Sequence, residues 1–297
     1  MEIIKTRAAL AERLAGLRSA GASVGLVPTM GALHAGHASL VARSVGENDA
    51  TVVSVFVNPT QFNDPRDLER YPRSEAADAA LLERMGADIA FMPSVEEMYP
   101  EPDERKFSFP PIDTVMEGRF RPGHFNGVCQ IVSKLLCAVE PRRAYFGKKD
   151  FQQVAVVRAM AKSLGLGVEI CACPIVREPD GLALSSRNAL LLPAERAHAA
   201  EIWRALAASR HYAAEGHSVE DTRRFVAQRV EAVEGLSVQY FEIVDGYSLQ
   251  PVSGWDADSH YVVGCIAAFC GHLPVRLIDN VEYVVPAAEA DAPRKNS

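Results

Sequence analysis

Strand-like and helix-like segments alternate along roughly the first 180 residues of this 297-residue chain. The clearest strand is residues 51–57, which are rich in β-branched side chains and apolar throughout, as in a strand covered on both faces. A helix is expected at residues 74–85, between a serine that can cap it and Gly86. Because such alternation favours parallel β-α-β units, we expect an α/β fold with a doubly wound parallel sheet.

The remaining elements follow the same pattern. We expect strands at residues 24–27, 89–92, 144–146 and 168–175, and helices at residues 34–45, 126–139 and 150–164, the last capped by Asp150. Sheets of this kind bind ligands at the carboxyl ends of their strands. The loops at residues 28–33, 58–63 and 147–150 lie there.

The pattern changes after residue 188. Two surface helices are expected at residues 194–214 and 218–233, followed by strands near residues 238–244, 261–269 and 274–278. We therefore expect a doubly wound domain over residues 1–180 and a smaller α+β domain over residues 181–285. A Pro-Asp-Gly turn marks the junction, within residues 177–188. Residues 286–297 are expected to be a disordered tail.

Composition narrows the class of protein. The net charge of −7 argues against a general nucleic-acid or anionic membrane surface, so we expect neither partner. Charges near the N-terminus interrupt the apolar core that a signal peptide needs, and no apolar run approaches the ~18 residues of a membrane span. Six cysteines lie in apolar stretches without Cys-x-x-Cys spacing, which favours buried, reduced thiols in a cytoplasmic protein.

The loop after the first strand carries the sequence His34-Ala-Gly-His37 at a helix start. Residues three apart on a helix are neighbours, so the two imidazoles can converge on one ligand. The free N–H groups and positive dipole end of a helix start favour a phosphate. Gly31 and Gly36 let a bulky ligand approach the backbone. A metal would need a third ligand that is not evident, and helix capping is the simpler alternative; we favour the phosphate.

Two further loops carry groups suited to a nucleotide. In the Gly147-Lys148-Lys149-Asp150 loop, lysine can neutralise a polyphosphate and Asp150 can accept hydrogen bonds from ribose hydroxyls. The alternative is a solvated basic turn with an N-cap aspartate. Ser185-Ser186-Arg187-Asn188 offers hydroxyl and guanidinium donors for phosphate oxygens, although by itself it is an ordinary polar loop.

Gln61 and Gln153 suit a small polar substrate. Gln61 follows the second strand and Gln153 stands at a helix start, but an exposed turn is the usual interpretation of such a segment. The segment at residues 119–125 is either a mobile gate or a surface loop.

Five blocks of this chain, taken in order, resemble the pantothenate synthetase (pantoate–β-alanine ligase) family of the His-x-Gly-His nucleotidyltransferase superfamily. They are Pro-Thr-Met-Gly-Ala-Leu-His-x-Gly-His (28–37), Phe-Val-Asn-Pro-x-Gln-Phe (56–62), Tyr-Pro-Arg (71–73), Phe-Gly-x-Lys-Asp-x-Gln-Gln (146–153) and Ser-Ser-Arg-Asn (185–188). Two positions depart from the family pattern: Lys148 replaces the usual glutamate, and Leu184 replaces the usual methionine.

The resemblance implies a Rossmann-like, nucleotidyltransferase-type fold and an ATP-dependent ligase. Pantoate and ATP would form pantoyl adenylate and pyrophosphate, and β-alanine would then displace AMP to give pantothenate. Because a carboxylate must attack an anionic α-phosphate, catalysis would consist mainly of positioning and charge neutralisation. The resemblance also implies Mg²⁺ and a homodimer. The smaller domain would act as a lid, closing with the 119–125 segment over an adenylate that water would hydrolyse.

The resemblance assigns roles residue by residue. The catalytic residues would be His34, His37, Lys149 and Arg187. The ATP-binding residues would be Met30, His37, Gly147, Lys149, Asp150, Val176, Ser185, Ser186 and Arg187, and the pantoate-binding residues Gln61, Gln153 and Met30. Asp78 is a candidate cation ligand, although a surface helix carboxylate is the simpler interpretation. No residue is assigned as the general base for β-alanine.

Three other functions fit parts of the pattern. The His-x-Gly-His motif alone permits another nucleotidyltransferase or carboxylate-adenylating enzyme, or an aminoacyl-tRNA synthetase-like core. The Gln61 and Gln153 blocks and the lack of a basic RNA-binding module disfavour both. A nucleotide-binding regulator without activity would not need the two histidines and Lys149.

Overall fold

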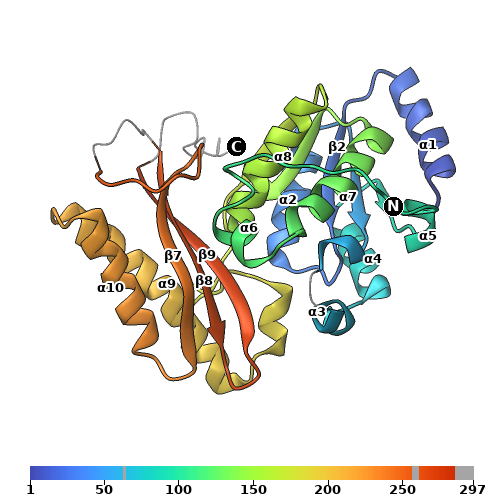
Figure 1. Ribbon diagram of the computed structural model, residues 1–297. Helices are drawn as coiled ribbons and strands as arrows, with labels where there is room; N and C mark the ends of the chain where they lie inside the picture. Colours follow the sequence, from blue (N-terminus) through green and yellow to red (C-terminus); the bar gives the residue numbers. More distant parts are fainter. Residues whose placement is uncertain (63–64, 256–260, 285–297) are drawn as a thin grey trace. The chain divides into compact units, whose positions relative to one another are not determined.

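The computed structural model describes residues 1–62, 65–255 and 261–284. The chain forms two compact units, Met1–Val176 and a second that begins at Arg177. Figure 1 shows a sheet flanked by helices in the first unit, and two long helices beside three strands in the second.

A parallel sheet in the order β1-β4-β3-β2-β5-β6 forms the centre of the first unit. Its strands are β1 (Glu2–Ile4), β2 (Val24–Thr29), β3 (Ala50–Val55), β4 (Ile89–Phe91), β5 (Arg143–Gly147) and β6 (Glu169–Cys173). The predicted doubly wound parallel sheet is therefore confirmed. The edge strand β1 was not predicted, because its three residues lie among charges that hide a strand pattern.

Longer helices cover both faces of this sheet. They are α1 (Arg7–Ser19), α2 (Ala35–Glu47), α4 (Glu75–Arg84), α7 (His124–Val139) and α8 (Phe151–Ser163). Shorter elements are η1 (Pro59–Gln61), α3 (Pro65–Arg70), α5 (Val95–Met98), α6 (Met116–Phe120) and η2 (Lys148–Asp150). Helix α1 was not predicted; its weakly amphipathic sequence has Thr6 as its N-cap.

Successive residues of the central strands supply two separate cores, because side chains alternate across a sheet. Leu26 of β2 packs in a core with residues of α1, α7 and α8, whereas Val27 packs in a core with residues of α2 and α4. Gly25 lets α2 lie close to β2: a Cβ there would come within 2.3 Å of the Ser44 hydroxyl oxygen. The two cores fix the strand ends that carry the site loops.

The second unit is an α+β structure with an antiparallel sheet in the order β7-β8-β9. Its strands are β7 (Leu236–Asp245), β8 (Val262–Cys270) and β9 (Val275–Val284), and its helices are α9 (Pro193–Ala214) and α10 (Val219–Glu231), with the short η3 (Ser186–Leu190). Apolar residues of α9 and α10 form one core with the sheet. The predicted tail at residues 286–297 lies outside the described residues.

Two predictions about the chain need correction. The 119–125 segment is not an open loop, because α6 ends at Phe120 and α7 begins at His124, which is buried. The six cysteines are free thiols, but Cys137 is exposed on α7. Within the described part of the chain, no helix has the length and apolarity that a bilayer crossing requires.

Candidate active site

The predicted site loops meet where the strand order reverses. Strand β2 lies between β3 and β5, and β4 follows β3 on one side while β6 follows β5 on the other. In a parallel sheet, loops at the carboxyl ends of such strands form the ligand crevice. The loop after β2 carries His34 and His37, the turn after β3 carries Gln61, and the turn after β5 carries Lys149. These residues share one edge of the first unit.

The loop after β2 is held by a buried carboxylate. Gly31 and Ala32 both have positive φ values, 81° and 48°, which point successive N–H groups in one direction. Asp78 of α4 accepts hydrogen bonds there, from Ala32 N at 2.9 Å and Leu33 N at 2.8 Å. The Ser74 hydroxyl donates to the same carboxylate at 3.2 Å. An internal anion therefore fixes the loop that leads into the histidines.

This arrangement changes two interpretations of the sequence. Asp78 is not a surface carboxylate, because only 3% of it is exposed. The group that approaches Gly31 is Asp78 itself, whose Oδ2 would lie 3.0 Å from an added Cβ. Both carboxylate oxygens are engaged by N–H groups, and the described residues contain no cluster of three metal-binding side chains. The Asp78 carboxylate therefore already has a hydrogen-bond donor on each of its two oxygens.

His34 and His37 cap helix α2 through their Nδ1 atoms. Gly36 N donates to Nδ1 of His34 at 3.1 Å, and His34 N donates to Nδ1 of His37 at 3.3 Å. An Nδ1 that accepts leaves the proton of a neutral imidazole on Nε2. The ring centroids are 4.1 Å apart. The capping interpretation is thus correct for Nδ1, and it leaves each ring an Nε2–H that can donate to a ligand.

Burial keeps both rings neutral. The pKa of His34 is lowered to about 4, chiefly by burial and also by the nearby Lys149 ammonium, while Asp150 opposes the shift. Burial also lowers the pKa of His37 to about 3, with added effects from His34 and Lys149. At neutral pH the two imidazoles therefore act as hydrogen-bond donors without a positive charge, and Lys149 supplies the charge beside them.

The turn after β5 brings Lys149 and Asp150 to the histidines. Lys149 Nζ lies 3.7 Å from Asp150 Oδ1, at the start of α8. The predicted cap differs, because the Asp150 side chain makes no capping hydrogen bond to α8. Lys148, where the family usually has glutamate, is buried and not part of a solvated turn. An ammonium group and two imidazole N–H donors together can bind an anion such as a phosphate.

Gln61 belongs to the same site through Met30. Its Nε2 donates to Met30 Sδ at 2.9 Å. Its backbone oxygen accepts from Nδ1 of His124 at 2.8 Å, since Arg121 donates to the other ring nitrogen. Burial lowers the pKa of His124 to about 4. The turn is also close to α7: a Cβ on Gly127 would lie 2.2 Å from the backbone oxygen of Thr60.

The two glutamines at the start of α8 differ in role. Gln152 is buried, donates to the backbone oxygens of Ile112 and Val115, and accepts from the backbone N–H of Glu117. It holds the segment before α7. Gln153 is half-buried and lies on the same helix. Val176 ends the first unit, just after β6.

The remaining predicted residues belong to the second unit. Ser185 caps η3, and its hydroxyl accepts from Arg187 N at 3.3 Å. Asn188 donates from its side chain to the Ala183 backbone oxygen at 3.0 Å. Ser186 stands at the first position of η3. This short turn fixes the backbone from which the predicted phosphate-binding side chains project.

Sequence reasoning missed the residues that hold the site loops. Asp78 received a different interpretation, and His124 was included only as part of the 119–125 segment, with no role of its own. Their contacts come from elements distant in the sequence, as with Asp78 Oδ2 and Ala32 N. One sequence signal pointed to burial of Asp78: it lies between two alanines on a predicted helix. That signal does not indicate which residues the carboxylate contacts.

Comparison with known proteins agrees with the geometry. The family model described as "Pantoate-beta-alanine ligase" matches residues 2–282. A pantothenate synthetase from Bacteroides fragilis is 62% identical over 95% of this chain and 99% of its own length. One from Thermus thermophilus is 46% identical over 94% of this chain and 99% of its own length.

Two solved structures have the same fold. The crystal structure of pantothenate synthetase from T. thermophilus has a TM-score of 0.88 and 44% identity, covering 96% of this chain and all of that one. A pantoate–β-alanine ligase from Francisella tularensis, complexed with "Beta-gamma ATP and Beta-alanine", has a TM-score of 0.80 and 32% identity, covering 95% and 98%. The fold, the ordered motifs and these similarities together place the chain in the pantoate–β-alanine ligase family.

Proposed function

We propose that this protein joins pantoate to β-alanine at the expense of ATP, through a pantoyl-adenylate intermediate. The observation that carries the proposal is the pair of neutral imidazoles, His34 and His37, beside the Lys149 ammonium at the carboxyl end of β2. The F. tularensis relative whose structure contains an ATP species and β-alanine supports the substrate class.

In the first step a pantoate carboxylate oxygen attacks the α-phosphorus of ATP, and the bond to the pyrophosphate oxygen breaks. Negative charge grows on the phosphate oxygens as this happens. The Nε2–H groups of His34 and His37 and the Lys149 ammonium are placed to stabilise it. Both rings already carry the required proton at neutral pH, so no proton transfer to the phosphate is needed.

The other binding roles form one assignment. Gln61 and Gln153 hold pantoate with Met30, while Gly147, Asp150 and Val176 contact the nucleoside. Ser185, Ser186 and Arg187 of the second unit contact the phosphates, with Arg187 as a catalytic residue, and this unit acts as a lid. The Nε2 contact of Gln61 with Met30 supports the shared pocket.

Mg²⁺, the assembly and the location are also part of the proposal. Mg²⁺ commonly binds through substrate phosphates and few carboxylates. Because Asp78 is engaged by backbone N–H groups, we propose that the ion enters with ATP. We also propose a homodimer in the cytoplasm.

In the second step the β-alanine nitrogen attacks the acyl carbon, and the bond to the AMP oxygen breaks. Only a neutral amine is nucleophilic, so the β-alanine ammonium loses one proton to solvent before the attack. A phosphate oxygen of the departing AMP can accept the second proton, which leaves the nitrogen as the amide forms.

An omission assay tests the function. AMP and pyrophosphate are measured with ATP, Mg²⁺, pantoate and β-alanine, leaving out one component at a time. Sustained AMP release is expected only when all are present, and pyrophosphate release without β-alanine should stop after about one turnover per site because the adenylate stays bound. Sustained AMP release without pantoate would contradict the proposal and favour another nucleotidyltransferase.

A further inference from the structure

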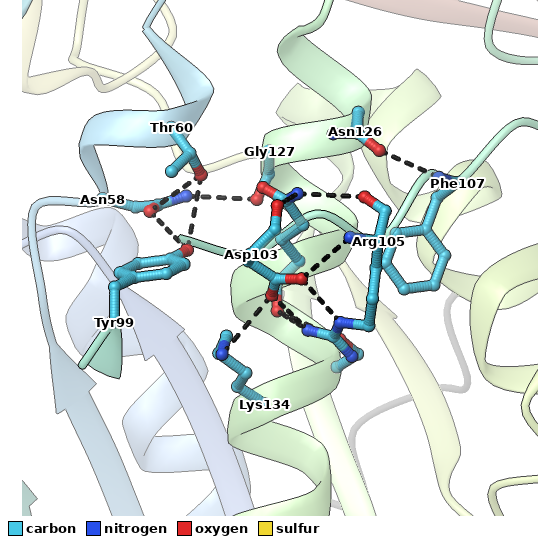
Figure 2. Close-up of polar contacts among 11 residues, drawn as sticks. Asn58, Thr60, Tyr99, Asp103, Arg105, Phe107, Asn126, Gly127 and Lys134 are labelled. Carbon is cyan, nitrogen blue, oxygen red and sulfur yellow. Dashed lines mark hydrogen bonds and ion pairs between the residues drawn. The ribbon is translucent and has the colours of Figure 1, made fainter. Parts of the chain in front are cut away.

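A buried amide connects Gln61 to a part of the first unit that the proposed mechanism does not use. Asn58 is 1% exposed and lies three residues before Gln61. Its Nδ2 donates to Gln61 Oε1 at 3.2 Å and to the backbone oxygen of Gly127 at 3.1 Å. Its Oδ1 accepts from the hydroxyls of Tyr99 at 2.8 Å and Thr60 at 3.1 Å. Figure 2 shows Asn58 between Tyr99 and Gly127.

These contacts determine which way the Gln61 amide faces. A backbone oxygen only accepts, so the Asn58 side facing Gly127 is the NH₂ group. The same NH₂ group meets Gln61, which must therefore present Oε1 to it. The Gln61 NH₂ group then faces the other way, where it meets the sulfur of Met30 at 2.9 Å. A thioether is a weak acceptor, so a substrate oxygen can replace it at little cost.

Tyr99 supplies the shorter of the two hydrogen bonds that hold the Asn58 oxygen. Burial raises the pKa of Tyr99, so its hydroxyl keeps the proton that it donates. The Tyr99 hydroxyl also lies 3.3 Å from the Thr60 hydroxyl. If the Tyr99 hydroxyl were absent, Thr60 alone would satisfy the buried oxygen, and the Asn58 amide would be held less firmly against Gln61.

The chain after Tyr99 is fixed to α7, which also accepts the Asn58 hydrogen bond. Asn126, Gln130 and Lys134 are spaced four residues apart and so share one face of the helix. They hold Phe107 N at 2.8 Å, the Asp103 oxygen at 2.7 Å and the Asp103 carboxylate at 3.4 Å. The Lys134 ammonium also lies 5.0 Å from the centre of the Tyr99 ring. Helix α7 therefore contacts both Asn58 and the chain segment after Tyr99, and Figure 2 shows Asn126, Gly127 and Lys134 on this helix.

We propose that Tyr99 is a positioning residue for the reaction, which acts through Asn58 to fix the Gln61 amide with its NH₂ group toward the substrate. The inference rests on the proposed pantoate site, since Gln61 must meet pantoate for its orientation to matter. It adds a chemical requirement: the pantoate group beside Gln61 is an acceptor oxygen of the carboxylate or of a hydroxyl.

The test compares Tyr99→Phe with Tyr145→Phe. Each variant removes one hydrogen-bonded hydroxyl, but the Tyr145 hydroxyl bonds Asn48 and Glu47 on the opposite face of the sheet. Pyrophosphate release and thermal unfolding are measured for both. Tyr99→Phe is expected to raise KM for pantoate about fivefold to tenfold, the effect of one weakened hydrogen bond, with KM for ATP unchanged. Tyr145→Phe is expected to leave both KM values unchanged.

A double-mutant cycle with Gln61→Ala separates positioning from general destabilisation. If Tyr99 acts through Gln61, adding Tyr99→Phe to Gln61→Ala should raise KM for pantoate no further. Additive effects, or an unchanged KM in folded Tyr99→Phe, would overturn the inference while leaving the pantoate site intact.

Two further outcomes complete the test. If Gln61→Ala itself leaves KM for pantoate unchanged, the proposed pantoate site fails and the inference fails with it. If Tyr99→Phe does not fold, Thr60→Val can replace it, because it removes the other hydrogen bond to the Asn58 oxygen. The same double-mutant cycle with Gln61→Ala then applies.

Discussion

The loop after β2 and the turn after β3 lie at neighbouring strand ends, yet they are held by different chemistry. The β2 loop depends on a charged group, since the Asp78 carboxylate accepts from Ala32 N and Leu33 N. The β3 turn depends on neutral groups, through the Asn58 amide and the close approach of Gly127 to Thr60. One loop presents the proposed catalytic imidazoles and the other the proposed pantoate contact. The difference suggests that the loops will respond differently to substitution and to pH.

The largest effect is expected at the charged loop and its partner lysine. His37→Ala or Lys149→Ala should lower turnover at least ~100-fold with thermal unfolding near that of the original protein, because each removes a group that stabilises charge in the transition state. Steady-state pyrophosphate release measures this. His211→Ala, on the exposed side of α9, is the matched control and should keep full activity. Near-native turnover by either site variant would refute its catalytic role.

Asp78→Asn should have the next largest effect. The asparagine keeps one acceptor and places an NH₂ group where the second backbone N–H donates. We expect about 1–3 kcal/mol less stability, the cost of a buried donor without a partner, and about tenfold lower turnover. Urea unfolding and kinetics measure the two. The exposed neighbour Glu75→Gln is the control.

A magnesium titration of Asp78→Asn separates positioning from metal binding. A positioning role leaves the Mg²⁺ concentration for half-maximal rate unchanged. If excess Mg²⁺ restored the rate, Asp78 would be a metal ligand and the charged-loop interpretation would be wrong.

Gly127→Ala tests the neutral turn. The new Cβ would lie 2.2 Å from the Thr60 backbone oxygen and 2.7 Å from Gln61 N, so the backbone must shift. We expect about 1–3 kcal/mol of destabilisation, as for overpacking, and a higher KM for pantoate. Gly46→Ala, in α2 with nothing within 4 Å, is the control and should gain about 0.5–1 kcal/mol from helix preference. Equal outcomes for the two glycines would remove the close-approach argument.

The two loops are also expected to differ in pH dependence. Folding lowers the pKa of His34, His37 and His124 to about 4, 3 and 4. As pH falls from about 6.5 toward these values, the unfolded chain binds protons that the folded chain does not, so stability decreases. Urea unfolding between pH 7 and pH 4 measures the slope.

Histidine variants show how much each of the two loops contributes to this pH dependence of stability. The slope of unfolding free energy against pH reflects the number of protons that the unfolded chain binds in excess of the folded chain. Replacing both His34 and His37 by asparagine should lower that number by about two, and His124→Asn by about one. Parallel stability curves for the variants and the original protein would show that these rings do not lose protons on folding.

The fold was more predictable than the supports of its site. Strand β3 is rich in β-branched residues, and helices such as α4 are bounded by cap and stop residues, so local sequence contains the pattern. Strand β1 was missed because three residues are too few to show a pattern and its stability comes from pairing with β4. The division of roles between Gln152 and Gln153 was also invisible, since it depends on carbonyl groups about 35–40 residues away.

The site motifs were visible because ligand-facing residues are concentrated in short loops. Their supports were not, because each comes from another element. Asp78 reaches across 46 residues to Ala32, and Tyr99 across 41 residues to Asn58. Contacts between residues so far apart in the chain cannot be predicted from a single sequence, because they depend on how the elements pack.

The Asp78 carboxylate occupies a cradle of backbone N–H groups that would otherwise attract any small anion. Because this carboxylate is covalently part of the chain, its effective concentration at the loop is high and constant. Free phosphate or sulfate must therefore displace it in order to bind these N–H groups. The loop therefore needs no ligand to stay formed between turnovers. The two backbone N–H groups of the loop are therefore already engaged when ATP arrives, which leaves its phosphates to the imidazoles and the lysine.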